Sequence, residues 1–524
     1  MDILKTVFIV DFEINLRKGV ITMKRRHLSE TLAMFLAVLM ILPSLTACSE
    51  TPDAEEAGQT VPSADEPGIA EEAVPEETEI TRENVPDTLP SDLDYSGKTF
   101  TIYYSNGFNW TELIEGGEEL TGEVVADAVI ESNLSVAERL NIDLQFFAEN
   151  TGNYGTIASL VSNLIMANDS TFDVYLGEQY GLAQTATKGY YRNVLELPYL
   201  DFEQPWWNTT FMENLQITSD NRMFLTGDFN LTTLCQLFVQ YFNKNLYNDL
   251  FGNPDDLYSL VLEGKWTLDA MSEKIEAAYI DLNGDGQTDP EDQLGYVAYQ
   301  TYSTVDPFMY CGDIPYTSFG EDGRVVLNMN QERAVTLTEK VVKLFNQKGT
   351  YKVDTSPFPV GKSLFCNGLL RGARDFRDMT DDFGFLPSPK LDETQESYQN
   401  LVGDCVLFTV IPVTCADAEM AAAVLEALNA QTYRTVTPAW YEVTLKMKYS
   451  RDMISADIID LIHDSIYTSF LFAYSPVLSQ MGQVMRDLVT NNNTDYMSLV
   501  KSKEKPAQKM LERMYKDLAE SQNP

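Results

Sequence analysis

Histidine is nearly missing from this chain of 524 residues, which holds only His27 and His463. So few imidazoles nearly exclude serine-type catalytic triads, histidine-rich zinc sites and most histidine general bases. Carboxylate chemistry is not excluded, because the chain holds 79 aspartate and glutamate residues.

Basic residues are also scarce. The chain has 37 Lys and Arg against 79 acidic residues, which gives a formal net charge of −42 and a pI near 4.2. A surface this acidic argues against nucleic acid and anionic membranes as direct partners. A neutral, hydroxyl-rich or cationic ligand fits the charge better.

Cysteines are few, and none of them forms a C-x-x-C pair, which excludes zinc ribbons and dithiol redox motifs. Apart from Cys48 their number is odd, so at least one thiol stays free. We expect buried structural cysteines with at most one or two disulfides at Cys235, Cys311, Cys366, Cys405 and Cys415.

The N-terminal region has a basic stretch after Met23, an apolar stretch over 31–43 and then "LTAC", which ends at Cys48. The apolar stretch is too short to span a bilayer comfortably. This order resembles a bacterial lipoprotein signal with its lipobox, which implies that residues 23–47 are a signal peptide and that Cys48 carries a lipid anchor. The alternative is an ordinary cleaved signal with a chance cysteine. We interpret residues 1–22 as an over-long start.

Composition changes sharply over residues 48–96. The stretch 49–92 is rich in Glu, Asp, Pro, Thr and Ala, has no aromatic residue and has one basic residue, Arg82. Such a segment buries too little apolar surface to offset its ordering entropy, and like charges keep it extended. We predict a disordered tether that holds the folded part away from the cell surface.

The folded part begins near Lys98 with alternating strand and helix patterns. This alternation indicates a parallel sheet covered by helices, in which ligands bind beyond the carboxyl ends of the strands. Those ends are 105–110 and 177–181. The predicted strands are 98–104, 142–147 and 172–176, and the predicted helices are 124–140 and 154–168.

Several later segments have a recognisable order along the chain. They are "YFNKNLY" (241–247), "EGKWTLDAMSEKI" (263–275, with Thr267 as N-cap), "GKSLFCNGLLRGARDF" (361–376), "DDFGFLPSPKLDETQESY" (381–398) and "YEVTLKMKYSRDMISADIIDLI" (441–462). With them, residues 98 to about 480 resemble the extracellular solute-binding proteins of ABC transporters, the family that includes maltose-binding protein.

The resemblance implies an α/β, two-lobed periplasmic-binding-protein-like (class II) fold, with central sheets flanked by helices and a cleft between the lobes. Lobe one would comprise 97–233 plus about 403–435, and lobe two 234–402 plus about 436–524 with the C-terminal helices, although the sequence leaves open on which lobe those helices pack. Apolar residues at 3–4 spacing predict a helix over 417–433 that returns to lobe one. The chain would be a monomeric binding protein and not an enzyme. Anchored at the extracellular face of the cell membrane through Cys48, it would deliver a small ligand to ABC transporter permease subunits.

Aromatic faces with flanking polar groups suit a sugar, whose C–H face stacks while its hydroxyls form hydrogen bonds. Trp110, Gln179, Tyr180 and Asp228 lie on lobe-one strand-end loops, and the resemblance places Asn367 and Arg371 in the cleft loop of lobe two. We therefore expect a sugar or oligosaccharide, although the family also takes up peptides, phosphonates and metal chelates. For the aromatic residues the alternative is a place in the core or on the surface.

Two other classes remain open. A secreted glycosidase needs only two carboxylates and no histidine, although no strand-end acid series repeats as a (β/α)8 barrel would require. A surface adhesin would suit the tether, but the usual all-β repeats are absent.

One further motif stands alone. Residues 281–293, "DLNGDGQTDPEDQ", have the spacing of an EF-hand calcium loop with Gly286 at the sharp turn. Asp292 replaces the usual glutamate, and a strand pattern follows where the second helix would be. We predict a structural calcium site in lobe two, apart from ligand recognition; the alternative is a metal-free turn. The predicted ligands are Asp281, Asn283, Asp285, Gln287 through its carbonyl, Asp289 and Asp292.

Overall fold

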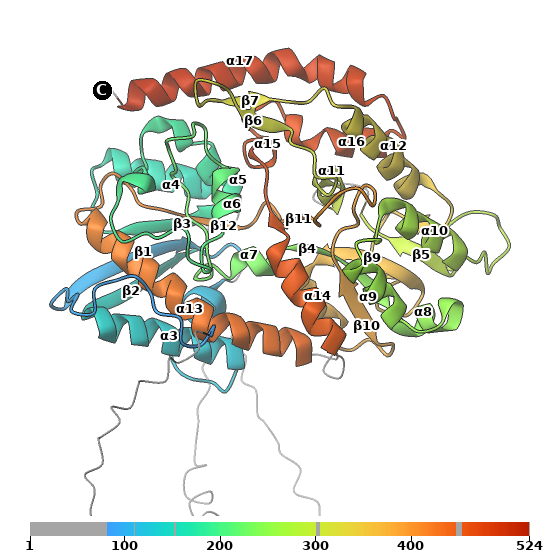
Figure 1. Ribbon diagram of the computed structural model, residues 1–524, viewed down its shortest axis with the longest axis horizontal. Coiled ribbons are helices and arrows are strands. Elements are labelled where there is room, and N and C mark those ends of the chain that lie inside the picture. Colours follow the sequence, from blue (N-terminus) through green and yellow to red (C-terminus); the bar gives the residue numbers. More distant parts are fainter. Residues whose placement is uncertain (1–80, 109, 151–153, 300–303, 447–452, 523–524) are drawn as a thin grey trace, which may run out of the picture. The chain divides into compact units, whose positions relative to one another are not determined.

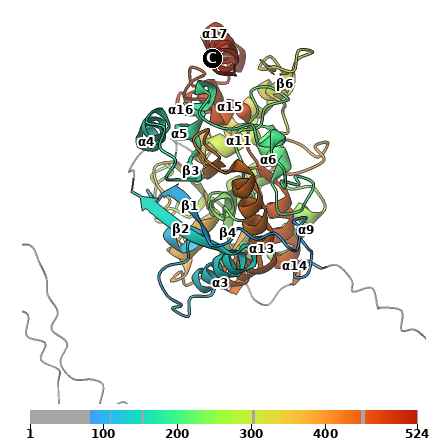
Figure 2. The same ribbon diagram turned by 90° about the vertical axis from the view of Figure 1, so that its left-hand side faces the viewer.

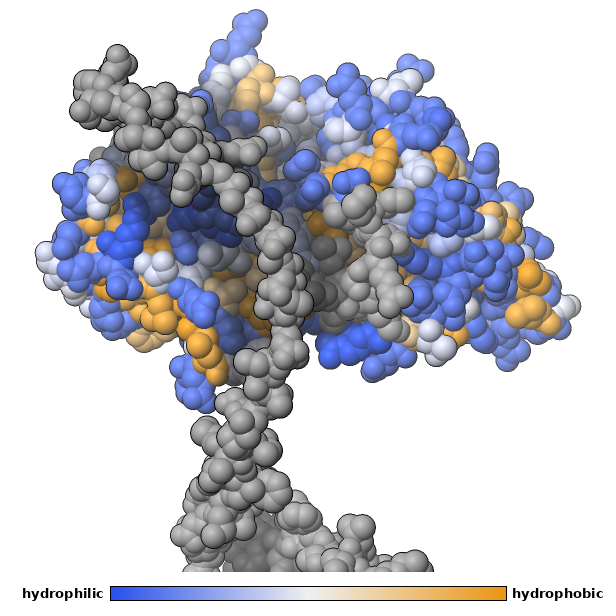
Figure 3. All heavy atoms as spheres, turned by 60° about the horizontal axis from the view of Figure 1, so that its bottom comes forward, coloured by the Kyte–Doolittle hydropathy of each residue, from blue (hydrophilic) through white to orange (hydrophobic). Residues whose placement is uncertain are grey.

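A computed structural model describes residues 81–108, 110–150, 154–299, 304–446 and 453–522, which all belong to one compact unit. The predicted signal peptide, Cys48 and the tether up to residue 80 lie outside the described residues. Residues 81–96, which the prediction also assigned to the disordered tether, are described and contact the folded part: Leu89 is buried, and Asp87 pairs with Arg139. Among those that are described, no helix is long and apolar enough to cross a membrane. Hydrophilic side chains predominate on the face drawn in Figure 3, and apolar ones form small groups.

The first sheet has the strand order β12-β3-β1-β2 within the described residues. Strands β1 (Lys98–Ser105), β2 (Ile142–Glu149) and β3 (Val174–Glu178) are parallel, and β12 (Leu407–Val410) runs antiparallel to β3. Helices α3 (Val124–Leu140) and α4 (Tyr154–Met166) connect the parallel strands, so the predicted strand–helix alternation is confirmed. Asn141 ends α3 in the left-handed conformation. We call this sheet with its helices lobe one (Figure 1).

The second sheet has the order β10-β4-β9-β5-β8. Its central strand β9 pairs antiparallel with β4 and parallel with β5. We call this sheet, with the helices around it, lobe two. Its strands are β4 (Phe238–Asn243), β5 (Leu294–Val297), β8 (Thr350–Tyr351), β9 (Ser363–Leu369) and β10 (Phe383–Leu386), and its helices include α8 (Lys244–Phe251), α9 (Asp255–Leu262), α10 (Leu268–Ala278), α11 (Asp306–Tyr310) and α12 (Glu332–Asn346).

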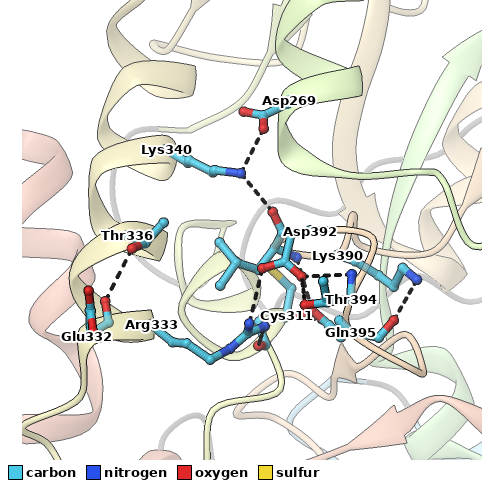
Figure 4. Close-up of polar contacts among 12 residues, drawn as sticks. Asp269, Cys311, Glu332, Arg333, Thr336, Lys340, Lys390, Asp392, Thr394 and Gln395 are labelled. Carbon is cyan, nitrogen blue, oxygen red and sulfur yellow. Dashed lines mark hydrogen bonds and ion pairs between the residues drawn. The ribbon is translucent and has the colours of Figure 1, made fainter.

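Polar contacts fix the helices of lobe two to one another. On α12, Lys340 donates to Asp269 of α10 at 2.7 Å and to the carbonyl of Leu391 at 3.1 Å, while Arg333 pairs with Asp392 at 3.1 Å (Figure 4). Thr267 caps α10 by accepting from the backbone N–H of Ala270, as predicted.

Two neighbouring segments of the described chain run from one lobe to the other. One is the stretch from α7 (Thr232–Cys235) into β4, and the other leads from β11 (Asn400–Leu401) to β12. They are joined where the backbone N–H of Gly403 donates to the carbonyl of Gln236 at 2.7 Å. Strand β11 also pairs with β13 (Ile466–Tyr467), so a third segment from the C-terminal region lies beside this crossing.

Helix α13 (Ala418–Lys446) continues well beyond the predicted helix over 417–433, with Pro438 inside it. It packs against α3 of lobe one, as Figures 1 and 2 both show. The predicted lobe division near residue 435 therefore falls inside a helix.

The C-terminal region consists of α14 (Met453–Asp464), α15 (Phe470–Ala473), α16 (Val484–Thr490) and α17 (Tyr496–Gln522). The sequence left open which lobe these helices join. The last helix, α17, contacts the short 3-10 helix η1 (Ala186–Lys188) of lobe one and also α12 and α16 (Figure 1). The hydroxyl of Tyr496 donates to the carbonyl of Met329 at 3.0 Å on the lobe-two side.

Candidate ligand-binding site

A cavity of about 1010 Å³ is lined by residues of both lobes. Lobe one contributes the loop after β1 and the short helix α2 (Thr111–Ile114). Lobe two contributes β4, the end of β9 and the 3-10 helix η4 (Leu370–Phe376), and Trp440 and Val443 of α13 complete the wall. The volume is at the upper limit of small-molecule sites, which run from about 300 to 1,000 Å³.

Asn106 positions the lobe-one side of the cavity. Its side-chain oxygen accepts from the backbone N–H of Thr111 at 3.2 Å, and its amide nitrogen lies 2.9 Å from the Thr111 hydroxyl. These bonds fold the strand-end loop back on itself. The cavity wall formed by this loop includes Phe108, which is 39% exposed, and Trp110, which is 2% exposed.

Tyr241 positions the lobe-two side. Its hydroxyl lies 2.7 Å from the carbonyl of Leu369 and 3.0 Å from that of Leu370, and so fixes the junction between β9 and η4. Arg371 follows this junction, and its guanidinium carbon is 5.2 Å from the centroid of the Trp110 ring and 5.9 Å from that of Phe108. These two contacts link lobe two to lobe one directly.

Asn367 is the buried polar group of the cavity wall. It lies on β9, is 3% exposed, and neither polar atom of its amide has a hydrogen-bond partner among the described residues. A buried amide left in this state is costly unless water or a ligand satisfies it. Asn367 is therefore a candidate contact for a polar ligand.

Three of the predicted ligand-binding residues thus come together at one cavity: Trp110, Asn367 and Arg371. They lie on two lobes, and Trp110 is more than 250 positions from the other two in the sequence. Trp110 is nearly covered, so its contact with Arg371 occupies the aromatic face that we expected a sugar to use.

The other three lie outside the residues that line this cavity. Gln179 is fully buried and its side-chain oxygen lies 3.3 Å from the hydroxyl of Thr468. Tyr180 accepts from the amide of Gln483 at 2.9 Å, and its ring packs on Phe472. Segments from the C-terminal 60 residues therefore cover these strand ends, which the sequence pattern could not reveal.

Asp228 is likewise held by the C-terminal half of the chain. It is 7% exposed and accepts from the hydroxyl of Thr437 at 2.7 Å. Burial raises the pKa of Asp228 to about 6, and the proximity of His463 partly opposes that rise. Asp228 is thus buried between α13 and α14, where it has a structural role.

Two exposed aromatic rings in the cavity wall were not among the predicted residues. Phe108 lies in the same strand-end loop as Trp110. Tyr299, which is 46% exposed, follows β5 in a stretch that the sequence pattern predicted as strand. Both expose ring surface that Trp110 does not. Their exposure depends on the tertiary structure, so no sequence signal distinguished them.

The predicted calcium loop joins α10 to β5, and a bridge between Ile280 and Gln293 closes it. Asp281 accepts from the backbone N–H groups of Gly284 at 2.6 Å and Gly286 at 2.9 Å. Gly286 has a φ of +77°, the left-handed turn expected at that position.

Asp292 at the end of the loop is fully buried and accepts from the backbone N–H groups of Leu282 and Asp289. The carboxyl groups of the loop thus face backbone amides. Within the described ranges, no group of three or more His, Cys, Asp or Glu residues is placed to hold a metal ion. The calcium site stays a prediction.

No disulfide joins the described cysteines, Cys235, Cys311, Cys366, Cys405 and Cys415, and four of them are buried, as expected for structural cysteines. Trp266, also fully buried, donates from its indole nitrogen to the carbonyl of Pro387 and belongs to the core of lobe two.

Neither a protein-family model nor a curated protein sequence matches the chain. Solved structures do. The cyclic α-maltosyl-1,6-maltose binding protein from Arthrobacter globiformis matches with a TM-score of 0.56 and 11% identity, over 80% of this chain and 100% of that one. An ABC transporter solute-binding protein from Thermotoga lettingae, bound with α-D-tagatose, has a TM-score of 0.48 and 14% identity, over 79% and 100% of the two chains.

The chain has the α/β, two-lobed periplasmic-binding-protein-like fold. The fold implied by the sequence resemblance is confirmed. At this level of identity the likeness concerns the fold, and the ligand has to be argued from the cavity.

Proposed function

We propose that this chain is a solute-binding protein that captures a small carbohydrate in the cavity and delivers it to the permease of an ABC transporter. The observation that carries the proposal is the composition of the cavity wall. It combines the exposed rings of Phe108 and Tyr299 with the unpartnered amide of Asn367. Rings can stack on the C–H faces of a sugar, and the amide can both donate to and accept from its hydroxyls.

The hydroxyl groups of Thr355 and Ser356 also belong to the cavity wall and add short polar groups to it. The solved structures of the same fold support the proposal, since the Arthrobacter protein is described as binding a cyclic maltosyl-maltose. A ligand that contacts both lobes would stabilise the closed arrangement, because its contacts with both lobes form together only when the lobes are closed around it.

A thermal-shift screen of the purified full chain against a glycan panel tests this proposal. We expect at least one glycan to raise the melting temperature, and to be recovered chemically intact after incubation. Cleavage of the glycan would instead favour the glycosidase alternative, for which Glu112 and Asp375 are the carboxylates that line the cavity. A Phe108→Ala variant should lose the shift, and Phe147→Ala, an exposed phenylalanine of β2 that does not line the cavity, is the matched control.

We further propose that Cys48 anchors the chain by a lipid to the extracellular face of the membrane, with residues 48–80 as part of the tether. The lipobox sequence before Cys48 supports this proposal. The acidic composition of the tether supports it too, since a highly charged segment stays extended and soluble.

The loop over 281–292 is proposed as a structural calcium site in lobe two. Its spacing and the turn at Gly286 support calcium, because they allow oxygen atoms at alternate positions to gather around one cation. None of its residues lines the cavity. Calcium would therefore stabilise lobe two without touching the ligand.

A further inference from the structure

Four charged residues line the cavity, and they differ in depth. Glu112, Arg374 and Asp375 are exposed, whereas Arg371 is half-buried. The formal charges cancel, but the exposed ones are screened by solvent and salt. The half-buried Arg371 lies in a lower dielectric than the three exposed charges, so its positive charge interacts more strongly with a ligand in the cavity.

Arg371 and Arg374 also lack the acidic partners that most other arginines have. Arg222, Arg333 and Arg486 are paired with Glu213, Asp392 and Asp306, respectively. In the part of the chain that the structure describes, neither guanidinium in the cavity wall has an ion pair or a hydrogen bond from its side chain. This is unexpected in a chain with 79 acidic and 37 basic residues.

The surroundings of Arg371 suit an anionic ligand. Its guanidinium lies near the rings of Trp110 and Phe108, a cation–π arrangement that holds the arginine in place. An arginine held against an aromatic ring keeps N–H donors free at its edge, and those donors match the two oxygens of a carboxylate. The unpartnered amide of Asn367 lies in the same cavity wall and suits a sugar hydroxyl.

We propose that the ligand of this cavity is an acidic oligosaccharide containing a uronic acid, and that Arg371 binds its carboxylate. This rests on the proposed function and names the ligand class within it. Trp110 acts as the support that positions Arg371, and Arg374 adds a second positive charge at the exposed edge. The net charge of the chain would repel such a ligand, and an unpaired arginine in the cavity is what offsets that repulsion.

Calorimetric titration of the full chain with matched ligands tests the proposal. The probes are trimers of galacturonate, glucuronate and mannuronate, the methyl ester of each, a sulfated trisaccharide and maltotriose. We expect at least one uronate trimer to bind 10-fold or more tighter than its methyl ester, which keeps the ring shape and loses the charge. Arg371→Gln should weaken binding of that trimer about 10- to 100-fold, as expected for a lost charge-assisted hydrogen-bond pair.

Arg371→Lys keeps the charge but loses the planar pair of donors. Its affinity for the uronate trimer should fall between that of the unchanged chain and that of Arg371→Gln. Arg513→Gln is the matched control, because Arg513 is an exposed arginine of α17 and does not line the cavity. The affinity of this control should equal that of the unchanged chain. If Arg371→Gln does not fold, the acid-to-ester ratio measured on the unchanged chain still decides the question.

The outcomes separate the two proposals. If maltotriose or the esters bind as tightly as the acids, the acidic-ligand proposal is overturned and the carbohydrate-binding function stands. If only the sulfated trisaccharide binds, the uronate class is overturned. If no glycan binds, both proposals are overturned together.

Discussion

Replacing Glu426 with glutamine should remove a pH-dependent loss of stability. Glu426 lies on α13 and is fully buried. One carboxyl oxygen accepts from the indole nitrogen of Trp207 at 2.8 Å and from the backbone N–H of Asp201 at 3.4 Å. Burial nevertheless dominates and raises the pKa of Glu426 from 4.5 to about 7, because desolvation disfavours the charged form.

The direction of the effect follows from which state holds the proton. Below pH 4.5 the carboxyl group of Glu426 is protonated in both the folded and the unfolded chain. Between pH 4.5 and 7 the unfolded chain loses the proton while the folded chain keeps it, so the free energy of unfolding falls as pH rises. The total loss is about 3 kcal/mol at 1.36 kcal/mol per pH unit, and it is complete above pH 7.

Glu426→Gln lacks this titration, so its free energy of unfolding relative to the unchanged chain should rise by about 3 kcal/mol between pH 4.5 and pH 8. For a unit of this size that corresponds to about 3 °C in melting temperature. Asp228 and Asp306, whose pKa values burial also raises to about 6, titrate in both proteins and cancel in the difference. Any constant cost of the amide likewise cancels.

Thermal melts of both proteins from pH 4.5 to pH 8 measure this difference. Glu419→Gln, which changes an exposed glutamate of the same helix, is the matched control and should follow the unchanged chain throughout. Parallel profiles for Glu426→Gln and the unchanged chain would refute the reasoning.

Three other predictions concern separate parts of the chain. Trp110→Ala should destabilise the fold by about 3–5 kcal/mol, because the ring is buried, and should also weaken ligand binding; a full retention of stability in denaturant melts would contradict its packing against Arg371. Chelation of calcium should lower the melting temperature by about 1–3 °C, corresponding to about 1–3 kcal/mol, without changing ligand affinity, and Asp285→Ala should abolish the response; a loss of ligand binding in folded protein would place the ion in the ligand site. Cys48→Ala should release the chain from the membrane fraction, whereas a variant that still pellets with membranes would rule out the lipid anchor.

The strands and helices of lobe one could be predicted because their signals are local. Apolar side chains at helical spacing defined α3 to the residue, and β-branched and aromatic runs defined β1 to β3. The helix predicted over 417–433 is too short, because α13 continues through Pro438 to Lys446. A proline normally ends a helix, and packing of α13 against α3 is a tertiary contact that the local pattern does not show.

The same difference between local and long-range signals separates the predicted site residues that line the cavity from those that do not. The family resemblance placed Asn367 and Arg371 in the cleft loop of lobe two, and the structure brings them to one cavity with Trp110. Gln179 and Asp228 also follow strand ends, but partners more than 200 positions later in the sequence bind them: Thr468 bonds to the side-chain oxygen of Gln179, and Thr437 to the carboxylate of Asp228. These contacts depend on where the C-terminal helices pack against the earlier part of the chain, and no local sequence pattern specifies that packing.

The most direct test of the central claim is a crystal structure of the chain grown with the glycan that gives the largest thermal shift. We predict an intact sugar in the cavity, with its rings against Phe108 and Tyr299 and a hydroxyl bonded to Asn367. A glycan bound elsewhere on the protein, with this cavity holding only solvent, would contradict the account.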